Sequence, residues 1–166
     1  MISIKIKAIF LIVLACAGFN SLPAMARKPN DIPLKKLLAS PDTVTIQGQR
    51  FRLETYLWRN FMPNSPPEGK PLRATLQVIP LDYVEVKGGI DADRVWVVSD
   101  GKILTAQLAP VGNPPSSGRI KKIEKMAVGG PKWGPGITVS VVVRLLDKDG
   151  NVYFLKATEQ PIYRTD

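Results

Sequence analysis

The chain has 166 residues and no histidine, and its 23 Lys and Arg against 14 Asp and Glu give a formal net charge of +9. This length is enough for one domain with a packed core of its own. The absence of histidine excludes the Ser–His and Cys–His catalytic pairs, and a single cysteine, Cys16, excludes a disulfide scaffold. Zinc is disfavoured, because its usual nitrogen and sulfur ligands are missing.

The first 26 residues have the features of a secretion signal. Two lysines precede an apolar run, 8–19, which is shorter than the roughly 20 residues that span a bilayer. A proline and the small residues Ala24 and Ala26 follow, so we expect signal peptidase to cleave after Ala26. A lipoprotein signal ending at Cys16 is the alternative, since residues 13–16 loosely match a lipobox.

The predicted cleavage decides the compartment and the partners that we expect. It leaves 21 basic and 14 acidic residues, a net charge of +7, on a periplasmic or secreted bacterial protein. Such a protein is expected to meet an envelope protein, an anionic glycan or a lipid headgroup, and export separates it from nucleic acid. Colloidal solubility explains the same charge without any ligand.

The mature chain begins with an N-terminal segment, 27–42, in which residues 33–39 could form one short helical turn with a proline at its start. From Thr43 onward, apolar and polar residues alternate between clusters of Gly, Pro, Asn and Asp, which is typical of β-strands. We predict a strand, in preference to a short helix, at 119–128. The other strands are predicted at 43–46, 50–61, 72–80, 95–98, 103–108, 137–145 and 152–158. Hairpin turns are predicted at Asp100-Gly101 and at 149–151.

The segment 137–145 has the strongest strand pattern. One face of it is wholly apolar, and this strand is therefore expected at the centre of the sheet. The residues of that face are Ile137, Val139, Val141, Val143 and Leu145.

These elements predict an all-β domain, 43–166, built as a two-sheet antiparallel sandwich of immunoglobulin or fibronectin type. The segments YLWRNFMPNSPPEGKPL, 56–72, and GGPKWGPGITVSVVVRLLDKDGNVYFLKATEQPIYRTD, 129–166, resemble exported bacterial proteins of unknown function. The resemblance implies a bacterial origin, and no activity or site. The Cys…Trp…Cys pattern of antibody domains is absent, so the immunoglobulin comparison concerns architecture alone.

Trp133 lies in a loop made almost entirely of glycine and proline, GGPKWGPG, 129–136. It either plugs the open end of the core or offers a stacking surface to a ligand, and we favour the plug. A basic run lies close to it in the sequence and could hold an acidic sugar or a headgroup through charge and stacking. The run consists of Arg119, Lys121, Lys122, Lys125 and Lys132, and we favour an ordinary solvated basic face as its explanation.

Two sets of residues have spacings known from catalytic sites. Ser99 and Lys102 match S-x-x-K, but neither S-D-N nor K-T-G accompanies them, and a hairpin turn explains the match. Asp91 and Asp93, or Glu85, could form a glycosidase pair, but they lie in a polar connection beside two glycines, where turn formation is the better explanation. We therefore predict no catalytic residue.

Asp147, Asp149 and Asn151 resemble the opening of a calcium-binding loop. The glutamate that such a loop needs at its twelfth position is replaced by Thr158, and a hairpin turn explains the same residues. We predict no metal and no cofactor, with calcium at these residues as the alternative.

Together these features predict an exported, non-catalytic binding or structural module of the bacterial envelope. It would act through a sheet edge, a loop end or its basic face. The alternatives are a small periplasmic hydrolase and a periplasmic chaperone or inhibitor with a protein partner.

Overall fold

The structure is a computed structural model of the chain, and it describes residues 32–166 except 83–84, 88 and 113–120. The predicted signal, with its cleavage residues Ala24 and Ala26 and with Cys16, lies outside the described residues, and so does Arg119. No helix in the described part of the chain has the length and apolar character needed to cross a membrane.

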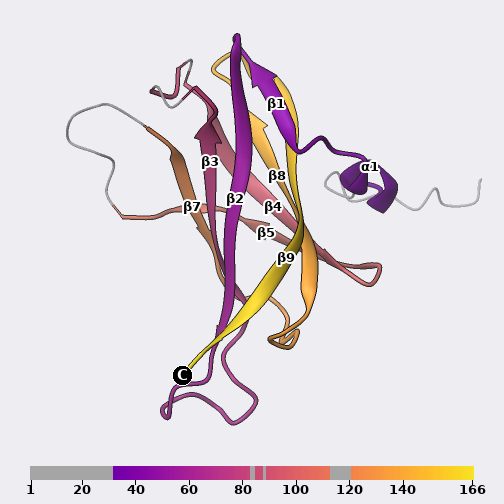
Figure 1. Ribbon diagram of the computed structural model, residues 1–166, viewed down its shortest axis with the longest axis vertical. Coiled ribbons are helices and arrows are strands. Elements are labelled where there is room, and N and C mark those ends of the chain that lie inside the picture. Colours follow the sequence, from indigo (N-terminus) through magenta and orange to yellow (C-terminus); the bar gives the residue numbers. More distant parts are fainter. Residues whose placement is uncertain (1–31, 83–84, 88, 113–120) are drawn as a thin grey trace, which may run out of the picture. The chain divides into compact units, whose positions relative to one another are not determined.

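One short helix and nine strands make up the described residues (Figure 1). They are α1 (Leu34–Leu38), β1 (Thr43–Ile46), β2 (Gln49–Asn60), β3 (Arg73–Pro80), β4 (Asp91–Ser99), β5 (Lys102–Gln107), β6 (Ala109–Pro110), β7 (Ile123–Ala127), β8 (Thr138–Leu146) and β9 (Val152–Thr165). The all-β prediction is confirmed. The helical turn after Pro33 and the preference for a strand at 123–127 are confirmed as well.

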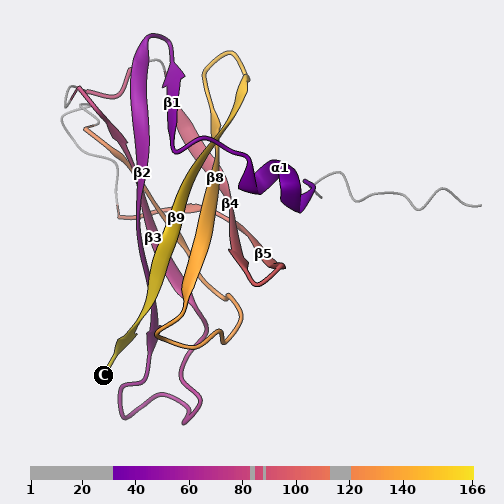
Figure 2. The ribbon, with the colours of Figure 1, turned by 45° about the vertical axis from the view of Figure 1, so that its right-hand side comes forward.

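The strands form one nine-stranded mixed sheet in the order β5-β4-β8-β9-β2-β3-β7-β6, with β1 paired to β2 outside this path. Neighbours are antiparallel except β2 and β9, which pair in parallel over four residues of each strand. The sheet curls until it is nearly barrel-shaped (Figures 1 and 2). A two-sheet sandwich of immunoglobulin type is not confirmed, since the hydrogen bonding runs through without a break.

β9 is the strand that makes the sheet continuous. It extends to Thr165, well beyond the predicted end at residue 158. Glu159 has a positive φ of 54°, and the pairing register between β8 and β9 shifts between Val139 and Val141. Such a bulge bends a strand and increases its twist. After the bulge β9 reaches β2, so one strand belongs to both halves of the sheet.

The predicted apolar face of β8 is confirmed at four positions, which are 3% exposed or less: Val139, Val141, Val143 and Leu145. Ile137 is the exception, because it precedes the strand and is 37% exposed. Val142, on the opposite face, is also fully buried. It packs with Trp96 under Leu37 of α1, so the helix provides a small second core outside the sheet.

The two hairpin turns are confirmed. Asp100 and Gly101 both have positive φ, 46° and 75°, as a type I′ turn requires. The predicted turn at Asp91 and Asp93 is wrong, because both residues lie in β4, whose pairing with β8 begins at Asp91 opposite Leu146. Asp93 itself lies at a register shift of that ladder.

Candidate binding site

The two ends of the sheet meet on one side of the molecule. β5 and β6 are consecutive in the chain, and β6 pairs with β7 through Ala109 opposite Met126 and Pro110 opposite Lys125. At the bend between them, the Leu108 amide donates to the Asp93 carbonyl of β4 at 2.9 Å. The chain itself therefore closes the sheet at this one point.

Away from that point, no backbone hydrogen bond joins β5 to β7 among the described residues. We call the gap the β5–β7 seam. A narrow crevice runs along it, lined by Leu72, Arg73, Ala74, Val97, Leu104, Ala106, Ala127, Val128 and Gly130. Apart from Arg73, the side chains that line this crevice are aliphatic.

Gly130 makes the crevice narrow. A Cβ built on this residue would lie 2.9 Å from Leu104 Cδ2 and 2.9 Å from Leu72 Cβ, so only glycine allows the backbone to come so close. Val128, which lines the crevice, is nevertheless 57% exposed, and Ile103, which neighbours Leu104 on the outer face of β5, is 40% exposed. Exposed aliphatic side chains thus flank a thin apolar crevice.

In the part of the chain that the structure describes, β5 presents an unpaired edge to the seam. Its inner side chains, Leu104 and Ala106, pack against the core, and Ile103, Thr105 and Gln107 alternate with them on the outer face. Natural sheets protect their edges with proline, charge, a bulge or a covering segment. β6 has Pro110, and the edge of β9 is covered where the Lys156 amide donates to the Pro41 carbonyl at 2.8 Å. β5 has a charge only at Lys102, its first residue.

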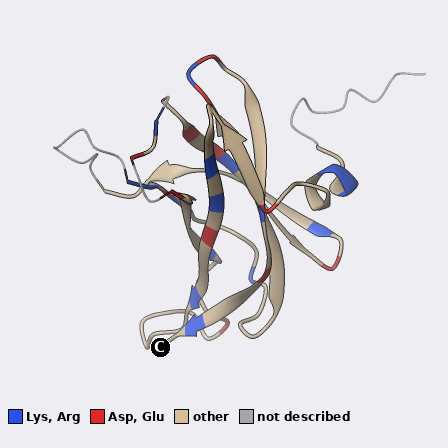
Figure 3. Cartoon of the chain, turned by 45° about the horizontal axis from the view of Figure 1, so that its top comes forward, with Lys and Arg blue, Asp and Glu red and all other residues tan. Residues whose placement is uncertain are grey.

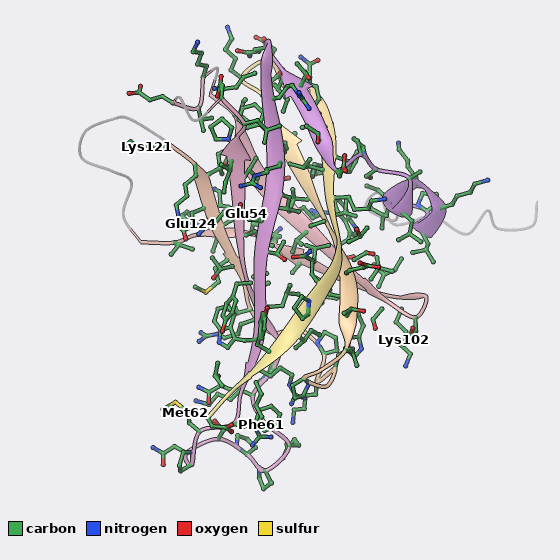
Figure 4. The ribbon with its side chains drawn as sticks, viewed as in Figure 1. Glu54, Phe61, Met62, Lys102, Lys121 and Glu124 are labelled. Carbon is green, nitrogen blue, oxygen red and sulfur yellow. The ribbon has the colours of Figure 1, made fainter. Side chains whose placement is uncertain are left out.

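Two cations lie on the elements that border the seam. Arg73 lines the crevice, and Lys102 projects from the β4–β5 hairpin (Figure 4). Neither forms an ion pair within the described ranges, and Asp100 occupies the turn beside Lys102. By contrast, Lys125 at the closed end bonds the Asp91 carboxylate across from β4, with 2.7 Å between Nζ and Oδ1.

The four described members of the predicted basic run do not form one patch. Lys121 and Lys122 precede β7 and Lys132 follows it, so the five residues of that strand separate them by about 17 Å. Lys122 pairs with Glu124 at 3.3 Å, and Lys132 pairs with Glu68. Figure 3 shows basic residues spread over α1, β2 and the hairpin ends, interspersed with acidic ones.

Trp133 is half-buried and packs against the main core, as a plug would. Its loop is held by Arg59 of β2, whose Nη1 donates to the carbonyls of Lys132 at 3.1 Å and Trp133 at 3.4 Å. Arg59 was not among the sequence-predicted site residues. The alternation along β2 could have identified it, because Arg59 continues the series of inward-facing residues Phe51, Leu53 and Leu57.

The candidate calcium residues form a hydrogen-bonded turn. The Asp147 carboxylate accepts bonds from the amides of Asp149 and Asn151, from the Asn151 side chain and from the Tyr153 hydroxyl, at 2.9–3.2 Å. These bonds, with the Asn151 side chain foremost, lower the pKa of Asp147. Donors therefore already surround the oxygens that a cation would need, and no cluster of metal-ligating side chains occurs among the described residues.

The residues with spacings known from catalytic sites are buried or already paired. Ser99 is buried at the end of β4, and within the described part of the chain no base is hydrogen-bonded to it. Asp91 is paired with Lys125, and Asp93 accepts two bonds from Arg144, one of them 2.8 Å from Nε to Oδ1. The Arg144 guanidinium holds the pKa of Asp93 below its usual value.

A hollow of about 220 Å³ lies on β2 and β3. Two of the polar side chains that line it already have partners: the Thr55 hydroxyl donates to Gln160 at 2.6 Å, and Gln77 donates to Glu124 at 2.8 Å. Figure 4 shows Glu54 on β2 and Glu124 on β7. We therefore assign it no ligand.

A comparison of the chain with models of protein families, with curated proteins and with solved structures finds no match. Within the described residues, the seam is the place where an unpaired strand edge, exposed aliphatic side chains and unpaired cations occur together.

Proposed function

We propose that this protein is an exported, non-catalytic binding module of the bacterial envelope that holds a protein partner at the β5–β7 seam. The observation that carries the proposal is the unpaired edge of β5 beside an apolar crevice. Edges of this kind recruit an extended strand from a partner, whose main chain completes the hydrogen bonding. A periplasmic chaperone or inhibitor would use the same surface.

We propose that the protein is exported because residues 1–26 have the features of a secretion signal, with cleavage after Ala26 and lipidation at Cys16 as the alternative.

We also infer that the two halves of the sheet, joined by β9, act as the two layers of an immunoglobulin-like sandwich. The pairing of Asp91 with Lys125 and of Asp93 with Arg144, together with the burial of Ser99, supports binding over the hydrolase alternative.

Site-specific crosslinking tests the proposal in the native envelope. A photoreactive residue at Thr105, on the outer face of β5, is expected to give a discrete crosslinked species. Ile103→Lys should remove that species, because a charge on the rim of the seam opposes the approach of an apolar strand.

Val152→Lys is the matched control, since Val152 is a 50% exposed aliphatic residue on a different strand. It should leave the crosslink intact, and a photoreactive residue at Thr45 on β1 should not give the same species. If Ile103→Lys retains the crosslink, or both lysine variants lose it equally, the seam is not the binding surface.

A further inference from the structure

We infer that the occupant of the seam is an extended, acidic peptide segment of another protein, with small β-branched or alanine side chains on the face that enters the crevice. This inference rests on the proposed function. It adds the chemistry of the partner, which follows from three properties of the seam: its width, its side-chain periodicity and its charge.

The width of the crevice selects small side chains. Ala74, Ala106 and Ala127 line it, and Gly130 lies against Leu104 across it. The crevice has only about 10 Å³ of space, so a leucine or an aromatic ring would force the two walls far apart, whereas alanine, threonine and valine require the least widening. The last two also have high strand propensity.

The periodicity of β5 sets the pattern of the partner. Side chains of an added strand alternate between the two faces, as those of β5 do. Every second partner residue therefore lies beside Leu104 and Ala106 over the crevice, and the others lie on the outer face beside Ile103 and Thr105. Val128 and Ile103 lose their contact with water, which provides apolar burial on both rims.

The charge of the seam selects an acidic segment. Arg73 lines it, and Lys102 begins the strand to whose edge the partner would pair. Neither has an ion pair in the described residues, and Asp100 in the turn beside Lys102 offsets part of their charge. Acidic residues at the ends of a six- to eight-residue strand would pair with these cations while its middle remains apolar. A basic segment would be repelled by the same two cations.

The test uses an eight-residue, fluorescein-labelled peptide with blocked ends that alternates valine with threonine or alanine and has aspartate at both ends. Two matched peptides differ only in lysine for the aspartates, or in a central proline. We expect the acidic peptide to bind about ten-fold more tightly than its lysine twin in anisotropy measurements at low salt, and this preference to shrink as salt is added. The proline peptide should not bind, because proline cannot complete the ladder.

Binding of the acidic peptide should also slow amide exchange in β5 and leave exchange in β1 unchanged. Arg73→Glu should reverse the preference between the acidic and lysine peptides, whereas Arg50→Glu, at an exposed arginine elsewhere on the sheet, should preserve it. Equal binding of the acidic and lysine peptides, or tolerance of the central proline, would overturn the inference.

The crosslinking and peptide results separate the two proposals. A Thr105 crosslink that Ile103→Lys removes, together with an acidic peptide that does not bind, retains the seam as the binding surface and rejects this partner. A crosslink to a second copy of the same chain, or to a glycan, also rejects it. Loss of the Thr105 crosslink in every variant, including Val152→Lys, rejects the proposed function itself.

Discussion

Arg59 is 3% exposed, yet every bond that it donates goes to a backbone carbonyl. Nε bonds Lys70 at 3.0 Å, Nη2 bonds Glu68, and Nη1 bonds Lys132 and Trp133 at 3.1 and 3.4 Å. A guanidinium has five donors in a rigid fork, so it can satisfy several carbonyls at once. One side chain of β2 thereby fixes the loop before β3 and the loop that contains Trp133.

Arg59→Ala is expected to lower the free energy of unfolding by about 3–5 kcal/mol, because it leaves several buried carbonyls without donors. Arg59→Lys should restore only part of this loss, since an ammonium group cannot reach all four carbonyls. Urea denaturation measures both. Arg52→Ala is the control, because its exposed pair with Glu54 is worth about 1 kcal/mol or less. Equal losses for Arg59→Ala and Arg52→Ala would contradict this account.

At this scale the sequence predicted burial better than it predicted bonding. The alternation along β2 and β8 identified nearly every buried apolar residue of those strands. The Gly/Pro loop indicated that Trp133 would pack against the end of the core, and its half-burial agrees with that interpretation. The loop composition did not reveal Arg59, because the carbonyls that hold it come from segments 9 to 74 residues away in the sequence.

β9 also makes a contact with a distant segment that the local sequence does not predict. The turn residues at 149–151 predicted the hairpin of β8 and β9, and the pairing of these two strands follows from it. Nothing local predicts that residues 162–165 would pair in parallel with β2. The seam could not be predicted for the same reason, since it depends on the order of the strands and on the bend between β5 and β6.

The parallel junction is held in part by three aromatic rings on its outer face. Tyr56 stacks on Tyr163 with centroids 5.1 Å apart, and it lies 5.3 Å from Trp58. Because only four residues of each strand pair here, we expect these rings to contribute measurably to the junction.

Tyr163→Ala should lower the free energy of unfolding by about 1–2 kcal/mol and speed amide exchange at residues 162–165, with β8 unaffected. Tyr163→Phe keeps the ring and should be nearly neutral. Unfolding in urea and amide exchange by NMR test this together. Fast exchange throughout the sheet in Tyr163→Ala would show that the ring supports more than the junction.

For the whole molecule, the absence of histidine determines how stability depends on pH. No side chain of unperturbed pKa changes charge between about pH 5 and pH 8, so stability should be nearly constant over that range. At lower pH, the protonation of carboxylates determines how stability changes. Hydrogen bonds from Arg144 lower the pKa of Asp93, and bonds within the β8–β9 turn lower that of Asp147. Each group binds its proton more weakly in the folded than in the unfolded protein.

A lowered pKa in the folded state stabilises the protein above the unfolded-state pKa, near 4, and this contribution is lost as the pH falls through the folded value. The midpoint of urea unfolding should therefore be flat from pH 8 to 5 and fall between about pH 5 and 2. Asp93→Asn should reduce stability at pH 7 and make the fall shallower, because the ionised partner of Arg144 is gone at every pH. Asp42→Asn, at an exposed carboxylate, should leave both unchanged. An Asp93→Asn curve that runs parallel to that of the wild type would show that this pair does not respond to acid, and Asp147 would then be the remaining carboxylate of the two to substitute.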